Sequence, residues 1–509
     1  MIPFDVGRSM LNVRRSHFIE RDGAVKTAWK ILWRGLAGLV ALLLLLLAGL
    51  ILWQRTHNPW PAPVPGVRLE PKLPVLKPAD VTPDNAFYYL RQIRQVPPPG
   101  PIFREEEETA LKQAEEEEIK FRALGWEPGQ YPGKEQWVRE NQILIALLTQ
   151  AAAQPPAQSS CPDAFSNVIL IREVVRCLDS VIQQDAAEGR FPEAVRNVGV
   201  LLRTGRIFQS GGNELFSVLG IVFQKRATDS VRRILLTKDV PEPEQRMLQE
   251  LLAVADLEMT QTMPGEILRY DLRDAIQCGK SVYGPAGLAG VGWRETLGND
   301  WQITALRVAQ QSGLLPLMGS SREQTKKHFE AIYSHGIAIL DTPYYPQASA
   351  ERFNRSSEFN LLPDPTDSPA SRLFKNDPLG GILARRLFSS HGTVVVRWYQ
   401  ALAELRVTRI ILAIKQYQAA HAGKAPESLT ELTPAYLEKL PDDPFAGPGV
   451  TFAYTVRADG GWVLRDRRPP DQESDGTFAS DEFKTKRKEY LKKEAERQRA
   501  EQSAAGRKP

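Results

Sequence analysis

The stretch Asn167–Phe208 reads NVILIREVVRCLDSVIQQDAAEGRFPEAVRNVGVLLRTGRIF and decides the fold class of this chain. Its first half, Asn167–Ala187, carries apolar residues at the three-and-four spacing of one buried helical stripe. The segment Glu188–Pro192 ends this helix and starts another, because Gly permits a change of backbone direction and Pro fits the first turn of a helix. The stretch therefore predicts an αα-hairpin.

The same pattern continues on both sides of this hairpin. Glu214–Leu236 and Pro241–Met259 are expected to form a second helix pair, and Thr82–Asn85 supplies the start signals of an earlier helix. The turn Ala187–Ala194 resembles the turn of tetratricopeptide hairpins, yet the ~34-residue repetition of that family is missing, which favours an ordinary hairpin. We therefore predict a helical ectodomain over residues 82–390, with long loops where Gly, Pro, Ser and Asp are frequent.

Nineteen consecutive residues near the N-terminus, Gly35–Trp53, carry no formal charge. At ~1.5 Å of rise per residue, a helix of this length spans the ~30 Å apolar core of a bilayer. A cleaved signal peptide would end at small residues, whereas this run ends in Ile51–Trp53, so an uncleaved signal-anchor is favoured. Basic residues are more frequent before the run than after it. We expect a cytoplasmic basic segment (1–30), a single inner-membrane helix (31–53) and an extracytoplasmic bulk.

Composition distinguishes the two flanks of the predicted ectodomain. Residues 54–81 are rich in Pro, which favours an extended, stiff stalk. The last residues, 484–509, contain ten Lys or Arg and four Glu, a formal charge of +6, whereas the whole chain carries +4. The remainder is therefore close to neutral, which argues against a nucleic-acid groove. Residues 481–509 have almost no apolar content, so we expect a disordered tail or a solvated helix.

Catalytic and nucleotide-binding motifs are weak throughout the chain. Cys278–Ser281 ends like a phosphate-binding loop, but Asp274 occupies the position of the opening glycine and a helical pattern precedes it. His328 and His335 are two helical turns apart, ~10 Å, which is too far to share a metal ion with ~2 Å bonds. No HExxH or GxSxG signature occurs. The sequence therefore favours no catalytic residue and no organic cofactor.

The cysteines and the acidic runs leave alternatives open. Cys161 and Cys177 could close a short loop in an oxidising compartment or remain buried thiols. The acidic blocks Glu105–Glu108 and Glu115–Glu118 lie on one expected helix. Calcium or a basic partner would suit these blocks, but a solvated helical face is the commoner meaning of such runs.

Residues 391–480 combine a long helix with a β-hairpin. Val396–Ala420 has the apolar spacing of a buried helix and ends before Gly423. Two short apolar runs within Val450–Arg465 are joined by a loop containing Asp459-Gly460, which is a strong hairpin signal. The fold class expected is therefore mainly α, with a single N-terminal transmembrane helix, a helical-hairpin ectodomain and a small C-terminal α+β module.

Between this helix and hairpin the chain carries an ordered motif, Y…H.GK.P.SL.EL.P.YL..LP.DPF.G, which starts at Tyr417. The order of elements resembles the C-terminal region of the major pseudopilin of type II secretion over about residues 407–475, and the tails of membrane-anchored bacterial proteins of uncharacterised type. The resemblance implies a small antiparallel sheet packed on the helix. It also implies a calcium site, with solvated loop carboxylates as the alternative. The corresponding residues are Asp466, Asp471 and Asp475.

Two classes of function remain open. The features above favour a membrane-anchored, non-enzymatic interaction or scaffold protein of the bacterial envelope, and the resemblance suggests an association with secretion or pilus-like machinery. The alternative is an envelope enzyme or small-ligand receptor with a site in the loops of residues 284–390, near His328, His335 or His391. The expected partners are the membrane, through Gly35–Trp53, and a protein, with no nucleic acid.

Overall fold

The computed structural model of the chain describes residues 30, 32–43, 45–46, 49, 62–72, 75–76, 81–96, 108–155, 158–159, 168–210, 214–262, 264–282, 322–345, 391–468 and 476–505. The chain divides into two compact units. One comprises residues 1–61, 281–328 and 363–382, and the other comprises residues 62–280, 329–362 and 383–509. The helices and strands named below lie in the second unit, apart from the N-terminal helical residues and the ends of two helices, α10 and α13.

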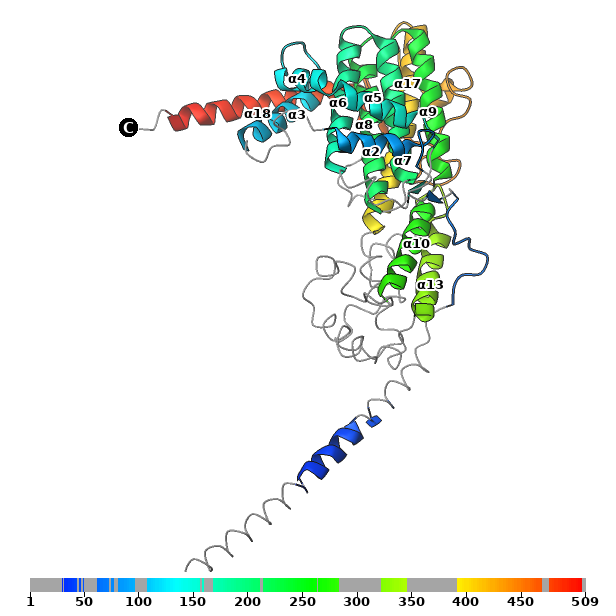
Figure 1. Cartoon of the computed structure of the whole chain (residues 1–509). Helices are drawn as coiled ribbons and strands as arrows, with labels where there is room; N and C mark the ends of the chain where they lie inside the picture. The colour runs from blue at the N-terminus through cyan, green and yellow to red at the C-terminus, as the bar shows by residue number, and fades with distance from the viewer. Residues whose placement is uncertain are drawn as a thin grey trace, which may run out of the picture. The chain divides into compact units, whose positions relative to one another are not determined.

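The prediction of a transmembrane helix at Gly35–Trp53 is wrong. In the first unit the described residues 30, 32–43, 45–46 and 49 are helical, and part of this segment is drawn as a dark blue helix in Figure 1. Among the described residues, no helix is both long and apolar enough to cross a membrane. This finding corrects the expected signal-anchor, the single-pass topology, the inner-membrane location and the membrane partner.

The second unit is mainly helical and carries a small antiparallel sheet, as the sequence predicts. Its helices are α2 (Ala86–Gln95), α3 (Glu108–Leu124), α4 (Pro132–Glu140), α5 (Gln142–Ala152), α6 (Val168–Ala187), α7 (Phe191–Ser210), α8 (Glu214–Thr237), α9 (Glu242–Gln261), α10 (Pro264–Val282), α13 (Arg322–Leu340), α17 (His391–Ala420) and α18 (Glu482–Ala505). Its other elements are β1 (Val75–Leu76), β2 (Gln158–Ser159), the 3-10 helix η5 (Leu429–Leu432), β3 (Ala453–Val456), β4 (Trp462–Arg465) and β5 (Thr477–Ala479).

The predicted hairpins form the centre of this unit. Helices α6 and α7 are joined by a turn in which Gly189 has φ +76° and the Arg190 amide donates to the Asp185 carbonyl at 2.8 Å. This is the glycine-ended helix terminus that the sequence indicates. Helix α7 packs against α6 and α8, α8 packs against α17, and α17 packs against α9. Figure 1 shows these helices side by side, with α2 and α5 against them.

Two glycines set the close approach of α7 and α8. A Cβ atom on Gly220 of α8 would lie 2.6 Å from Cγ of Gln209 and would also overlap the carbonyl oxygen of Gly205 on α7. Beside this crossing the Gln209 side chain donates to the Gln224 side chain at 2.7 Å in the buried interior. The two backbones therefore approach more closely than any larger residue at Gly220 would allow.

Helix α17 is the helix of the predicted C-terminal module, and it passes through the core of the helical unit. Trp398, Leu402, Ile410 and Ile414 are all fully buried. A helix that is apolar on all sides needs neighbours on all sides, and α8 and α9 supply two of them. The module and the helical hairpins thus share one core.

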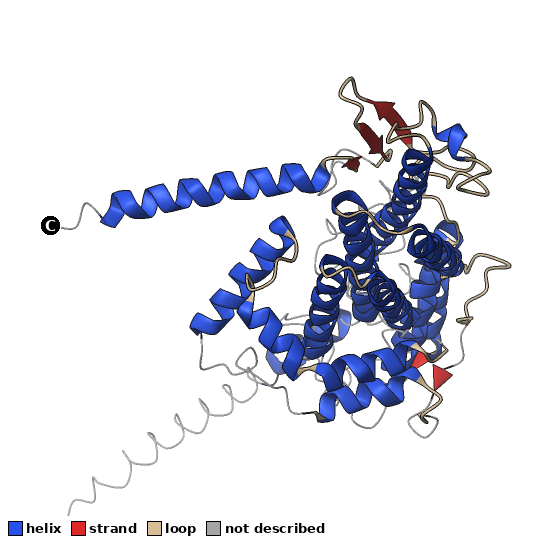
Figure 2. Ribbon diagram, turned by 90° about the horizontal axis from the view of Figure 1, so that it is seen from above, coloured by secondary structure: helices blue, strands red, loops and turns tan. Residues whose placement is uncertain are grey.

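The expected hairpin is present at the end of this unit. Strands β3 and β4 pair antiparallel with Val456 opposite Trp462, and β5 pairs with β4 on its other edge. The turn contains Gly460, whose φ of +78° requires a residue that tolerates left-handed backbone. Trp462 and Leu464 are fully buried. Figure 2 views the bundle from above, with the three-stranded sheet at its periphery.

Residues 62–72, within the predicted stalk, run along α10 and α13. The backbone amide of Val64 donates to Oγ of Ser334 at 2.9 Å. The Arg269 guanidinium donates to the Arg68 carbonyl at 2.8 Å and to the carboxylates of Glu266 and Asp341, both at 2.9 Å. A buried arginine satisfied on three sides fixes this extended segment to the two helices.

Candidate interaction surface

The predicted calcium carboxylates are only partly described. Asp466 is fully buried, and both of its oxygens accept hydrogen bonds from the Arg468 guanidinium, from Nε at 2.8 and 3.0 Å. Asp471 and Asp475 lie outside the described residues. Within the described ranges, no group of three or more His, Cys, Asp or Glu side chains could hold a metal ion. The three-carboxylate calcium site remains a prediction.

The ordered motif after α17 shapes the chain through local contacts. The Tyr417 hydroxyl donates to Glu431 at 2.6 Å, and the His421 ring stacks on Tyr417 with centroids 3.8 Å apart. Glu431 also accepts the Ser428 amide at 2.9 Å as part of a capping box at η5. Gly423, with φ +84°, lets the chain leave α17. These motif residues therefore hold the turn between α17 and η5.

The Asp-Asp-Pro-Phe part of the motif has an equally clear structural role. Asp443 is fully buried and accepts the backbone amides of Phe445 and Arg467, at 2.9 and 2.8 Å. Burial raises the pKa of Asp443, and these two amide donors oppose that rise. The carboxylate therefore ties the loop after η5 to the segment that follows β4.

The other residues singled out in the sequence form no catalytic constellation within the part of the chain that the structure describes. His328 is buried on α13, and His335 Nε2 lies 3.3 Å from the Ala62 carbonyl oxygen. The His391 side chain, Cys161 and most of the loops over 284–390 lie outside the described residues. Cys177 is a buried free thiol whose pKa is raised by burial, which opposes thiolate formation.

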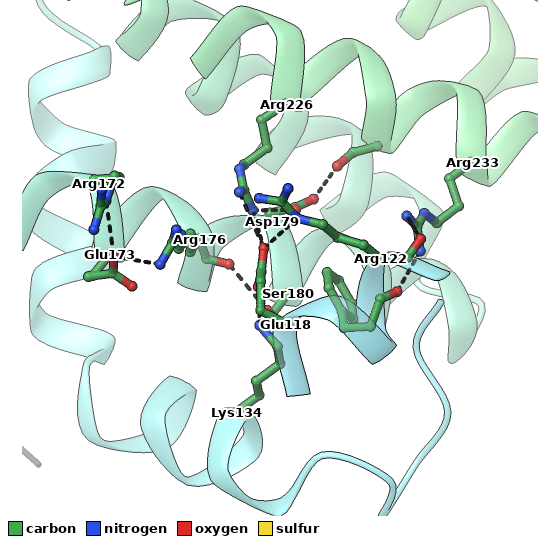
Figure 3. A network of polar contacts seen from close by, with 12 residues as sticks. Glu118, Arg122, Lys134, Arg172, Glu173, Arg176, Asp179, Ser180, Arg226 and Arg233 are labelled. Carbon is green, nitrogen blue, oxygen red and sulfur yellow. Dashed lines mark hydrogen bonds and ion pairs between the residues drawn. The ribbon is translucent and has the colours of Figure 1, made fainter. Parts of the chain in front are cut away.

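A polar network joins α3 and α4 to α6 and α8 (Figure 3). Glu118 of α3 pairs with Lys134 of α4 at 2.6 Å, with Arg122 at 2.8 Å and with Arg226 of α8 at 3.2 Å. Arg226 also pairs with Asp179 of α6 at 3.0 Å. The network thus places alternating negative and positive groups across four helices.

The charges in this network are mutually satisfied. Burial by itself raises the pKa of Glu118, but the positive charges of Lys134, Arg226 and Arg122 outweigh it and hold the pKa far below its usual range. Asp179 accepts the Ser230 hydroxyl in addition to Arg226. A carboxylate whose pKa is lowered and whose oxygens are paired, as in Glu118, is a poor general base, so the arrangement indicates that these ion pairs attach α3 to the other helices.

Aromatic residues complete the attachment of α3. Phe121, Trp126 and Tyr131 form a buried cluster, with the Phe121 ring centroid 6.3 Å from Trp126 and 5.8 Å from Tyr131. The Arg233 guanidinium lies 5.6 Å from the Phe121 ring centroid and donates to the Phe121 carbonyl at 2.7 Å. Helix α3 is therefore fixed to α8 by stacking as well as by charge.

The C-terminal helix α18 lies along α3. Arg487 pairs with Glu127, just after α3, at 3.2 Å, and Arg497 pairs with Glu116, near the start of α3, at 3.5 Å. Because the later residue of α18 meets the earlier residue of α3, the helices are antiparallel. Phe483 anchors the start of α18 in a buried position, 5.0 Å from the Arg233 guanidinium. The acidic block thus has a basic partner within this chain.

The side of α18 that faces away from α3 carries exposed charge. Lys488, Lys492 and Arg499 follow one another at spacings of four and seven residues, which places them in one row opposite Arg487 and Arg497. All three are exposed, and none has a hydrogen-bond or ion-pair partner among the described residues. Figures 1 and 2 show α18 leading away from the helix bundle to the C-terminus. This outward row is the candidate interaction surface.

Comparison with known proteins adds no constraint on this surface. No protein-family model, no curated protein and no solved structure matches the chain. The sequence predicted a charged helix or a disordered tail here but did not pair it with α3. The available signal was charge complementarity between the acidic block Glu115–Glu118 and the basic residues 484–499.

Proposed function

We propose that this chain is a non-enzymatic interaction protein in which α18 contacts an acidic surface of a partner protein. The observation that carries the proposal is the division of α18 into two sides. One side is already occupied, with Arg487 and Arg497 paired to α3. The other side exposes Lys488, Lys492 and Arg499 in a continuous row. A helix held along one side presents the other in a fixed geometry, which reduces the ordering cost of binding.

The charge pattern favours a protein partner over a uniform polyanion. Glu489 and Glu496, seven residues apart, are exposed and form a second row beside Lys488 and Lys492. Carboxylates in this position repel a phosphate backbone, whereas a protein helix can oppose each row with the matching charge. Only one large apolar side chain, Leu491, is exposed on the described part of α18. The contact is therefore electrostatic, with rapid, salt-dependent association.

The pseudopilin resemblance is part of the same proposal. It is supported by the long helix α17, the hairpin β3–β4 and the contacts within the ordered motif, which follow one another in the order that the resemblance implies. We propose on this basis that the partner belongs to secretion or pilus-like machinery. The proposal needs no catalytic group, and the charged clusters around α3 contribute to stability.

The test uses a labelled, helical peptide with Glu at every fourth position, and a matched peptide with Gln in those positions. We expect the Glu peptide to bind the full chain in fluorescence anisotropy, and to bind more weakly as salt shortens the Debye length below ~10 Å. The double variant Lys488→Glu/Lys492→Glu should weaken binding about tenfold or more. Equal binding of the Glu and Gln peptides would contradict the proposal.

A matched variant separates the local row from the total charge. Lys424→Glu/Lys439→Glu changes the net charge equally, at two exposed lysines of the segment after α17. It should leave binding of the Glu peptide unchanged. If it weakens binding as much as the α18 variant does, the attraction is a property of the whole molecule and α18 is not its site. Duplex DNA that binds more tightly than the Glu peptide would also refute a protein-specific surface.

A further inference from the structure

We infer that the outward side of α9 docks an amphipathic helix of a partner protein, with the acidic edge of that helix beside α7. Met247, Val254 and Leu257 are 45%, 54% and 60% exposed. Their spacing of seven and three residues places them in one stripe along the helix. Leu251, half-buried, lies beside this stripe. Single exposed apolar residues are ordinary on protein surfaces, but an aligned set on one helix is typical of a binding site.

The opposite side of α9 already supplies the contacts that the fold needs. Leu248, Leu252 and Met259 are buried, and α9 packs there against α17. Asp256 on the same side pairs with Arg406 at 3.0 Å. A helix that is apolar on both sides resembles one enclosed by neighbours. The exposed stripe is therefore available for a contact that the described part of the chain does not supply.

Helix α7 gives this surface a positively charged edge. Helices α7 and α9 are neighbours: a Cβ on Gly199 would lie 3.4 Å from Leu251, and Arg206 forms an ion pair with Glu258. Arg203 and Arg196 lie on the same side of α7 as Gly199 and Arg206, at helical spacing. Both are exposed and have no ion-pair partner among the described residues. They would face carboxylates on the near edge of a docked helix.

The far edge of the stripe carries the opposite charge. Glu250 is exposed between Met247 and Val254 on the side away from Gly199, and no described residue pairs with it. The neighbouring pair Glu242–Arg246 is already formed. A partner helix would thus match this surface with an apolar seam, acidic residues toward α7 and a basic residue toward Glu250. This asymmetry fixes which way round the partner binds.

Charge complementarity selects a separate partner over a second copy of this chain. A symmetric pair would place α9 against α9, so that each stripe would meet its own sequence. Arg196 and Arg203 lie on one edge only. An antiparallel symmetric pair would place these arginines against the same arginines of the other copy, and a parallel pair would offer them the one unpaired carboxylate of Glu250. An acidic, amphipathic helix satisfies both arginines and the stripe at once. This surface does not involve α18 and does not depend on the function proposed for it.

The experiment uses the full chain and two synthetic helical peptides that share one Leu seam at three-and-four spacing. One carries Glu along the α7 edge and the other carries Lys there. We expect the chain to bind the Glu peptide, and to bind the Lys peptide at least tenfold more weakly. Val254→Asp or Leu257→Asp should lower the affinity for the Glu peptide at least tenfold. Arg196→Glu/Arg203→Glu should remove the preference between the two peptides.

Control variants test whether the peptide binds at the exposed stripe of α9. Ile143→Asp, at a 65% exposed residue of α5, should leave binding unchanged, and circular dichroism should show that every variant keeps its helices. Val254→Asp should leave binding of the Glu peptide without a Leu seam, the probe for α18, unchanged, which separates this surface from α18. Failure of the Glu peptide to bind, or equal weakening by Ile143→Asp and Val254→Asp, would overturn the inference. Self-association that Val254→Asp abolishes would show that a second copy is the occupant, which also overturns it.

Discussion

Replacing Glu118 by Gln tests whether the polar network clamps α3. Removing one partner of a fully buried ion pair costs about 3–5 kcal/mol. Here Arg226 keeps Asp179 at 3.0 Å, and Arg122 is 56% exposed, so neither is left as an uncompensated buried charge. Lys134, which is 15% exposed, loses its only ion pair among the described residues. Glu118→Gln should therefore lower the free energy of unfolding by about 1.5–3 kcal/mol, the range expected when hydrogen bonds to a charged group are lost.

Urea denaturation followed by circular dichroism measures this cost, and hydrogen exchange of the α3 amides measures local opening. The control is Glu242→Gln, whose pair with Arg246 has both side chains 71% exposed and is expected to contribute about 0–0.5 kcal/mol. Exchange in α3 should accelerate in Glu118→Gln and stay unchanged in the control. Equal costs for the two variants, or a cost without faster exchange in α3, would refute the clamp.

Other variants test the electrostatics and packing. The cost of Glu118→Gln should be complete above the unfolded pKa of ~4.3 and shrink as pH falls toward the lower folded pKa, as unfolding at pH 7 and pH 3 would show. Gly220→Ala should cost about 2 kcal/mol or more through overlap with Gly205, whereas Gly199→Ala should be neutral or stabilising; melting temperatures rank them. Trp462→Ala should cost about 3–5 kcal/mol and Lys484→Ala almost nothing, measured in urea.

The helices of the core were predictable because their signals are local. The expected helix Asn167–Ala187 corresponds to α6 (Val168–Ala187), since the apolar spacing, Gly189 and Pro192 all lie within one stretch. The turn at Asp459-Gly460 was predictable for the same reason, because a left-handed residue between two apolar runs specifies a hairpin. The burial of Trp462 follows from the alternation of the strand.

The contacts of the candidate surface were not predictable, because they join residues that are remote in sequence. Arg497 and Glu116 are separated by 381 residues, and no spacing rule relates them. Asp466 was assigned to calcium by resemblance, but Arg468, two residues later, occupies its oxygens. The transmembrane prediction rested on a single apolar run, whereas no helix among the described residues is both long and apolar enough to cross a membrane.

The position of α17 in the core has a consequence for synthesis on the ribosome. Lys225 of α8 pairs with Glu404, 179 residues later, and Asp256 of α9 pairs with Arg406, 150 residues later. A nascent chain can close the α6–α7 and α7–α8 hairpins early, yet α8 and α9 must wait with apolar surface uncovered until α17 emerges. We therefore expect the yield of folded protein to depend on how well this apolar surface is protected from aggregation until α17 has been translated.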